Sequence, residues 1–307
     1  MTTAYITHPV CARHDMGSYH PECPERLAAI SDQLIVSGLA PYLDHHEAPR
    51  ASREQILRVH PRAYLERLEE ASPAHGLVQL DPDTAMNPFS LEAALHAAGA
   101  VVLATDLVMR GAASTAFCAV RPPGHHAERR RAMGFCLFNN VAIGVAHARE
   151  QWGMERVAVV DFDVHHGNGT EEIFSGDPHV LMVSTFEHPF YPFSGTEHPA
   201  DNMVNVPLSA GDGGEEFRRA VSEAWLPALH RFRPEMVFIS AGFDAHREDD
   251  MANLGLVEGD YAWVTQQLVG VAGQYGQGRI VSVLEGGYAL SALGRSVVAH
   301  VRGLAQI

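Results

Sequence analysis

The chain has 307 residues, 46% of them hydrophobic, which is enough to bury one large core. Its formal net charge is −15 and its 22 basic residues are all arginines, which argues against a nucleic-acid partner. It has four cysteines without a C-x-x-C pair, no secretory signal and no apolar run that approaches membrane-spanning length. We therefore expect one cytoplasmic domain over residues 1–307 that does not enter a membrane.

Short apolar runs and helix-like stretches alternate along the chain. In chain order we expect a helix over 91–109, strands over 116–120, 157–161 and 180–184, a helix over 215–230, a strand over 236–240, a helix over 261–274 and a strand over 280–284. Strands that are apolar throughout and separated by helices indicate a parallel sheet covered on both faces. The sequence therefore predicts an α/β fold with a central open parallel sheet, whose chemistry lies where the strands end.

The segment after the strand at 157–161 carries residues suited to a metal. In an extended segment alternate side chains share one face, so Asp161, Asp163 and His165 point the same way. One carboxylate and one imidazole are two of the three protein ligands of a catalytic zinc site, and the third must come from elsewhere. Asp244, which follows the strand at 236–240, completes such a set from a separate strand end, although a lone aspartate there is usually a cap or turn residue.

Two more motifs follow strands at the same edge. His125 and His126 follow the expected strand at 116–120, on a loop that contains two prolines and a glycine. One of the two histidines could take a proton from a metal-activated water. Tyr288 follows 280–284 after two glycines, and its hydroxyl could stabilise an oxyanion. Taken singly, the histidines could be surface residues and the tyrosine a packing residue. Together they indicate metal-assisted hydrolysis, with Asp161 and Asn168 orienting the two histidines.

The chain resembles the histone deacetylase superfamily, and its class II and bacterial acetylpolyamine amidohydrolase and acetoin-utilisation branches more than class I. Six motifs carry the resemblance in the family's order and cover nearly the whole chain: residues 20–27, 121–126, 134–140, 161–169, 241–244 and 284–288. Asn168 stands where class I members have aspartate, which is a class II trait. The resemblance implies an arginase/deacetylase fold with a central parallel sheet.

The resemblance also implies roles for the site residues. The Zn²⁺ ligands would be Asp163, His165 and Asp244, the tandem acid/base pair His125 and His126, and the residue that polarises the acyl carbonyl Tyr288. A structural potassium ion would lie near Asp161, Asp163, His165 and Ser184. The same N/O ligands accept ferrous iron as well as zinc, so both metals stay open.

Further residues are expected along the substrate's path. Phe135 and Phe193 match the aromatic pair that grips the acyl chain, and Gly134 belongs to the same substrate-binding motif as Phe135. Arg26 and Cys136 would line an inner cavity for acetate release. For each phenylalanine core packing is the alternative, and for Arg26 it is an ion pair on a helix surface.

Two residues at the expected rim bear on the substrate. Asp83 corresponds loosely to a residue that holds a peptide-like backbone, with a turn aspartate as the alternative. Met251 occupies the position that is acidic in polyamine-selective members, although the acidic residues 248–250 on the same loop could supply that charge. The candidate substrates are therefore acetyl-lysine in a peptide or protein, acetylated polyamines, and small aryl amides or esters.

Two other classes of protein are less compatible with the sequence. An arginase-like enzyme bridges two manganese ions with aspartates two residues beyond each ligand motif, where this chain has Gly167 and His246. A non-catalytic acyl-lysine or metal-binding module would be favoured by loss of the histidine pair or the tyrosine, and both are present. A homo-oligomer is compatible with the sequence.

Overall fold

The computed structural model describes residues 2–197 and 199–307. Its main sheet has eight strands in the described part of the chain, all paired in parallel, in the order β2-β1-β5-β10-β9-β6-β7-β8. These strands are β1 (Thr3–Thr7), β2 (Leu43–Glu47), β5 (Thr115–Cys118), β6 (Val157–Asp161), β7 (Val180–Glu187), β8 (Met203–Leu208), β9 (Met236–Ala241) and β10 (Ile280–Leu284). A small antiparallel pair, β3 (Val78–Asp81) and β4 (Thr84–Met86), stands apart from it.

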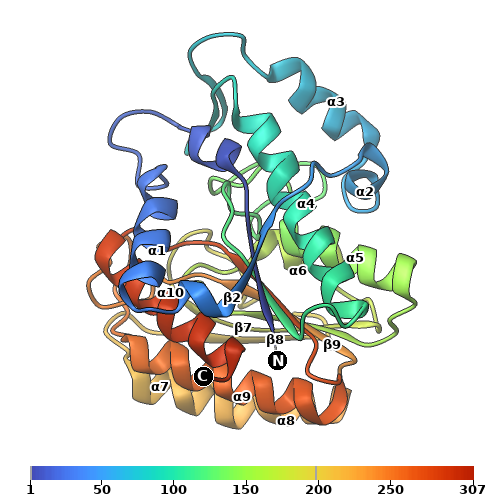
Figure 1. Ribbon diagram of the computed structural model, residues 1–307, viewed down its shortest axis with the longest axis vertical. Helices are drawn as coiled ribbons and strands as arrows, with labels where there is room; N and C mark the ends of the chain where they lie inside the picture. The colour runs from blue at the N-terminus through green and yellow to red at the C-terminus, as the bar shows by residue number, and fades with distance from the viewer. Residues whose placement is uncertain (1, 198) are drawn as a thin grey trace.

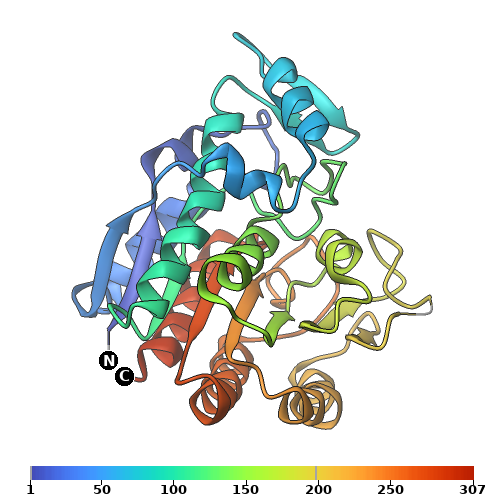
Figure 2. The same cartoon turned by 90° about the vertical axis from the view of Figure 1, so that its right-hand side faces the viewer.

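Helices cover both faces of the sheet (Figures 1 and 2). The α-helices are α1 (Glu25–Val36), α2 (Arg53–Leu57), α3 (Arg62–Ala71), α4 (Ser90–Met109), α5 (Asn140–Trp152), α6 (Asn168–Phe174), α7 (Gly214–Ala220), α8 (Leu226–Phe232), α9 (Glu258–Tyr275) and α10 (Leu290–Ala305). Two short 3₁₀ helices, η1 (Pro9–Arg13) and η2 (Ala40–Tyr42), and a π-helical turn, η3 (Val221–Trp225), complete the list. Helices α7, α8 and α9 lie together at the bottom of Figure 1, far from α2 and α3.

Alternate residues of each central strand enter two separate cores. On β6, Val157 and Val159 join the core that contains α4 and α5, whereas Ala158 and Val160 join the core that contains α1, α9 and α10. All four side chains are fully buried. This two-sided burial explains why the strand is apolar throughout, and the expected α/β fold with a parallel sheet covered on both faces is confirmed.

Several expected elements match the structure closely. The strands expected at 157–161 and 280–284 have those limits, and the helix expected at 261–274 is α9, which begins three residues earlier. The helix expected at 215–230 is interrupted by the π-helical turn η3 between α7 and α8. The single domain and the cytoplasmic location stay predictions.

The expectation that no apolar run approaches membrane-spanning length is wrong. Helix α4, with 20 residues, is long and apolar enough to cross a membrane by length and composition. This helix lies inside the protein instead. In its most apolar stretch 67% of the residues are buried, and the helix packs against α5 and the strands β1, β5 and β10. Its composition is that of a core helix.

A neutral histidine joins α10 to the sheet beneath the strand ends. His300 is fully buried; its Nδ1 lies 2.6 Å from the Thr265 hydroxyl, which itself donates to a carbonyl, and its Nε2 lies 2.8 Å from the Ser282 hydroxyl. Phe162 and Phe243 pack on its ring at centroid distances of 5.7 and 5.9 Å. Burial lowers the pKa of His300 to about 3, so both ring nitrogens serve as hydrogen-bonding groups of a neutral imidazole.

We predict that His300 makes the fold acid-sensitive. In the unfolded chain a histidine has a pKa of about 6.5, so between pH 6.5 and 3 the unfolded state binds the proton and stability falls as the pH falls. Between pH 7 and pH 5 this residue lowers the free energy of unfolding by about 2 kcal/mol. Urea unfolding at both pH values should therefore show a smaller acid loss for His300→Gln than for the wild type. The exposed His75→Gln is the control, and equal losses in all three proteins would contradict the assignment.

Candidate active site

Three ligand-type side chains converge where β6 and β9 end. Asp163 and His165 follow β6, Asp244 follows β9, and the two strands are neighbours in the sheet. One potential ligand atom of each side chain lies within 4.8 Å of the others, and all three residues are buried. The structure thus brings together the three residues that the sequence suggested for zinc.

The donor set fits a divalent cation. Backbone N–H groups hold both oxygens of Asp163, because Gly286 donates to Oδ2 and His165 donates to Oδ1, each at 2.8 Å. Asp244 accepts one backbone N–H, that of Val164, at Oδ1 at 3.0 Å. Asp244 Oδ2 is buried and has no hydrogen-bond partner among the described residues, and it lies 3.3 Å from His165 Nδ1. Two carboxylates and one imidazole with an orphaned oxygen are what a zinc ion would satisfy.

Electrostatics supports the same conclusion. Burial and the charge of Asp163 raise the pKa of Asp244 to about 6. Burial disfavours a positive charge on His165, but its hydrogen bond to Asp163 and the negative charges of Asp163 and Asp244 outweigh burial and raise the pKa of His165 to about 10. The two carboxylates therefore attract a cation strongly, and a bound metal would take the place of the histidine proton.

Close approach of β10 to these ligands requires glycine. A Cβ on Gly286 would lie 1.9 Å from Asp244 Oδ2 and 2.6 Å from Asp163 Oδ2. No side chain can be accommodated at that distance, so only glycine lets the backbone N–H of residue 286 reach Asp163.

The tandem histidines have different environments. His125 Nδ1 lies 3.0 Å from Asp161 Oδ2, whereas His126 Nδ1 lies 2.8 Å from the amide oxygen of Asn168. Burial disfavours a charge on His125, but Asp163 and Asp161 outweigh it and raise its pKa to about 10. Burial and the charge of His125 lower the pKa of His126 well below its usual value. At neutral pH the pair therefore consists of one charged and one neutral imidazole.

Asn168 fixes the neutral ring in one tautomer. Its Nδ2 donates to Glu128 Oε1 at 3.0 Å, so its Oδ1 faces His126 and accepts the Nδ1 proton. The lone pair of His126 is then on Nε2, and this nitrogen can accept a proton from a water that attacks a substrate. Asp161 and Asn168 thus contact the two histidines, and their orienting roles stay predictions.

A cavity of about 270 Å³ opens onto this group. The residues that line it are Asp83, Pro123, His125, His126, Gly134, Phe135, His165, Phe190, Tyr191, Met251, Gly286 and Tyr288. The rings of Phe135 and Tyr288 meet edge to face at a centroid distance of 6.0 Å, and the ring of Phe190 stacks on His165 at 5.6 Å. The cavity is therefore lined by aromatic rings together with histidines and one carboxylate, which suits an extended acyl chain.

Phe193 lies outside this cavity, contrary to the sequence-based expectation. Its side chain is 75% exposed, and its backbone N–H donates to Phe190 O at 2.7 Å in a tight turn. Phe190 and Tyr191 form the wall that we assigned to Phe193. The segment 190–193 contains three aromatic residues, and only the turn decides which of them face inward.

The expected rim residues all reach the cavity. Asp83 Oδ1 accepts hydrogen bonds from the Gly134 N–H at 3.0 Å and from the Thr84 hydroxyl at 2.7 Å. Met251 lines the cavity, and its N–H donates to Asp249 Oδ1. The structure therefore brings Asp83, Gly134 and Met251 together with Phe135.

Asp249 is a residue whose role the sequence did not reveal. It is buried, and its Oδ2 accepts hydrogen bonds from the N–H groups of Tyr288 at 2.6 Å and Ala289 at 2.9 Å. It thus anchors the backbone that carries the phenol. Glu248 is turned away and pairs with Arg295 at 2.8 Å, so neither residue supplies a free charge to the cavity.

Behind the cavity lies a buried ion cluster. Arg26 donates to Glu22 Oε1 at 2.9 Å and to the carbonyl oxygens of Gly287 and Glu285, and its guanidinium lies 5.0 Å from the centre of the Tyr288 ring. Arg26 is fully buried, so the alternative of a surface ion pair is wrong. Cys136 is also buried and donates to Gly134 O at 3.2 Å. The acetate-release role of Arg26 and Cys136 stays a prediction.

The same cluster contains an arginine that sequence reasoning missed. Arg121 is fully buried and forms a two-point ion pair with Glu22, with 2.6 Å between Nη2 and Oε2. These charges lower the pKa of Glu22 far below its usual value despite its burial. Glu22 precedes α1, which begins at Glu25, so its pairing with Arg26 depends on the loop before the helix and not on helical spacing.

The potassium site stays a prediction. Asp161 and Ser184 are paired across β6 and β7. The carboxylate of Asp161 already accepts from His125 and from the Asp163 N–H, and the Ser184 hydroxyl donates to Asn205 Oδ1 at 3.0 Å.

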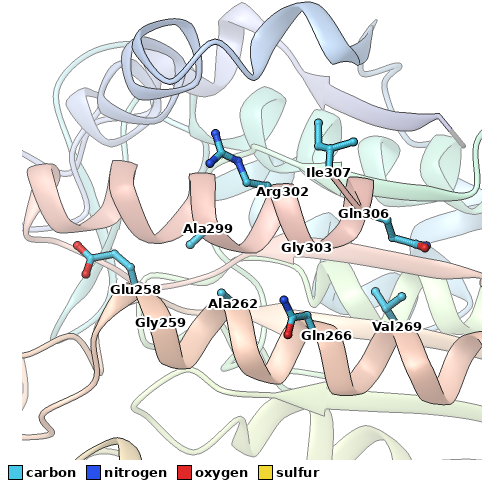
Figure 3. Close-up of a pocket in the computed structure, with 10 residues that line it drawn as sticks. All are labelled: Glu258, Gly259, Ala262, Gln266, Val269, Ala299, Arg302, Gly303, Gln306 and Ile307. Carbon is cyan, nitrogen blue, oxygen red and sulfur yellow. The ribbon is translucent and has the colours of Figure 1, made fainter.

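A larger hollow, of about 630 Å³, lies between α9 and α10 (Figure 3). Its charged lining residues are Glu258 and Arg302, and the others are small, aliphatic or amide residues. None of its ten described lining residues is a histidine, cysteine or hydroxyl residue, so its walls offer no nucleophile or imidazole base. The smaller cavity at the strand ends is therefore the candidate active site.

Comparisons with known proteins place the chain in a well-defined group. Residues 20–304 match the histone deacetylase domain. A histone deacetylase-like amidohydrolase from Pseudomonas aeruginosa is 40% identical over 276 residues, which cover 88% of this chain and 72% of that protein. The mouse protein named polyamine deacetylase HDAC10 is 38% identical over 92% of this chain and 44% of its own length. The crystal structure of the HDA15 HD domain superposes with a TM-score of 0.93 and 34% identity, covering 99% of this chain and 90% of that one.

We predict that Asp244→Asn lowers zinc affinity by at least about 100-fold, because it removes a charged ligand, and even outer partners of metal ligands contribute up to that factor. Competition titration with a chelator measures the affinity directly. Asp250→Asn is the matched control, since this acid lies on the same loop and is exposed. Equal zinc affinities in the two variants would exclude Asp244 as a ligand.

Proposed function

The chain belongs to the histone deacetylase family, and on that premise we propose that it is a Zn²⁺-dependent amidohydrolase that removes acetyl groups from amine nitrogens. Because the chain is a member of this family, it is a hydrolytic deacetylase. The observation that carries the proposal is that His165, one of the three ligand-type residues, lines the same cavity as His125, His126 and Tyr288, while Asp163 and Asp244 lie next to His165. Fe²⁺ would fit the same ligands.

Asp163, His165 and Asp244 would hold the ion, which when bound would polarise the acyl carbonyl and activate a water as nucleophile. His126 is suited to accept the proton of that water, because its Nδ1 proton is committed to Asn168 and its Nε2 carries a lone pair. The charged His125, held by Asp161, stabilises the negative charge that develops on the substrate. His126 then passes the proton that it took from the water to the amine nitrogen as the C–N bond breaks, which gives acetate and a free amine.

Tyr288 is the proposed donor to the acyl oxygen. Burial and the nearby charge of Asp244 raise the pKa of its hydroxyl well above the usual value, so it keeps its proton at neutral pH. Its ring is held by Phe135 and Arg26, and its backbone by Asp249. A donor fixed in advance stabilises developing charge without reorganisation.

The proposed substrate is acetyl-lysine in a peptide or a small acetylated amine. Phe135, Phe190 and Met251 offer apolar contacts to a linear alkyl chain. Asp83 is the only carboxylate among the described lining residues, and one of its oxygens is already used by Gly134 and Thr84. The other oxygen could attract a distal ammonium, which supports acetylated polyamines as the second candidate.

Acetate release from equal concentrations of an acetyl-lysine peptide, an acetylpolyamine and an aryl acetamide tests this proposal. We expect zinc-dependent release of acetate, fastest from the peptide, because Met251 stands at the position that is acidic in polyamine-selective members of the family. Apo enzyme is the control. A preference for the acetylpolyamine would reverse the order of the two candidates, and no release from any of the three would refute the proposed deacetylase activity.

We predict that Tyr288→Phe lowers kcat by about 10²–10³ while zinc content is unchanged, since removal of one oxyanion donor has that effect in other hydrolases. The exposed Tyr19→Phe serves as the matched control. Steady-state kinetics and metal analysis of both variants provide the measurement. Wild-type kcat in Tyr288→Phe would show that the phenol does not stabilise the transition state.

A further inference from the structure

A second buried carboxylate lies behind the tandem histidines. Glu285 directly follows β10, is fully buried and does not line the cavity. Its Oε2 accepts hydrogen bonds from the N–H groups of Gly124 at 2.6 Å and His125 at 3.1 Å. Its Oε1 accepts the Ser240 hydroxyl at 3.1 Å. Two of its three side-chain bonds therefore hold the backbone of the loop that carries the acid/base pair.

The backbone around Glu285 also reaches the metal ligands. The Glu285 carbonyl accepts a hydrogen bond from Arg26, and the next N–H, of Gly286, donates to Asp163 Oδ2. In the sheet, β10 lies between β5, which leads into the histidine loop, and β9, which leads to Asp244. This short segment thus ties the histidine loop to the carboxylates that would hold the metal.

Other described residues hold His125 at its carbonyl and at its ring, whereas Glu285 holds its N–H group. The His125 carbonyl is already used by the Thr170 N–H at 3.1 Å, and the ring of His125 is held by Asp161. The backbone at Gly124 packs closely against α5, because a Cβ there would lie 2.5 Å from the Asn140 nitrogen. Without an acceptor at Glu285, two buried N–H groups would be left unpaired, which is costly.

We propose that Glu285 is a positioning residue for deacetylation, which fixes the backbone at Gly124 and His125 and so sets the distance between the histidine pair and Asp163. That distance is 3.8 Å from His125 Nε2 to Asp163 Oδ1. The inference rests on the proposed function. Burial raises the pKa of Glu285 to about 7, but the role requires only an acceptor, which both the ionised and the protonated group provide.

A set of three variants tests whether the acceptor is what matters. Glu285→Gln keeps an acceptor oxygen for the two N–H groups, whereas Glu285→Met has a similar length and no oxygen. We expect kcat of the Gln variant within about threefold of the wild type, and kcat of the Met variant lower by about 10², the cost of a misplacement near 1 Å. KM should change little in both, because Glu285 does not line the cavity.

Glu285→Asp is the third variant and carries the test if the Met variant does not fold. It keeps the charge but is one methylene shorter, so it should lose kcat as the Met variant does. Ser240→Ala is the matched control, because it removes the other bond to Glu285 and leaves the two loop N–H groups bonded. Its kcat should stay within about threefold of the wild type.

Zinc content and thermal midpoint are measured on every variant to separate positioning from stability. The inference is overturned if the Met and Asp variants keep wild-type kcat, if the Gln variant is as slow as they are, or if kcat falls only in parallel with zinc content or folded fraction. An inactive wild type would instead refute the proposed deacetylase activity, so the two failures are distinguishable.

Discussion

The concentration of buried carboxylates at one edge of the sheet is the constraint on which this site depends. The acids that are no more than 1% exposed there are Glu22, Asp161, Asp163, Asp244 and Glu285. A buried carboxylate is tolerated only when charges or N–H donors compensate it. Arg26 and Arg121 neutralise Glu22, histidines face Asp161 and Asp163, and backbone N–H groups serve Glu285. The oxygen left without a partner is that of Asp244, which faces the other ligand-type side chains.

The parallel sheet makes this concentration possible. Strands β5, β10, β9 and β6 are neighbours and end at the same edge, so four short loops can bring their side chains to one point. Asp163 follows β6 and Gly286 follows β10, and the two residues share a hydrogen bond although they are 123 positions apart in sequence. The chemistry therefore depends on tertiary structure, while each loop by itself is an ordinary strand ending.

Much of this arrangement could be predicted from the sequence, for a local reason. β6, β9 and β10 are apolar because both of their faces are buried, and each is followed directly by its functional residues, so the strand and the site share one signal. The same reasoning did not find β2, whose exposed sequence Asp44–Glu47 is polar because it lies at the edge of the sheet. It also chose Phe193 over Phe190 and Tyr191, because the direction of a turn is set by backbone geometry that composition does not encode. The partnership of Arg121 with Glu22 spans 99 positions and left no local pattern.

The bonds of Asp249 have a consequence for how such a protein can diverge. One carboxylate holds the backbone N–H groups of Tyr288 and Ala289 with one oxygen and that of Met251 with the other. Since all three bonds are to main-chain groups, the side chain at position 251 can be exchanged without loosening the phenol. The lining of the cavity at position 251 can therefore change in size and polarity while the backbone that carries Tyr288 stays in place, so one loop can vary in one part and remain constant in another.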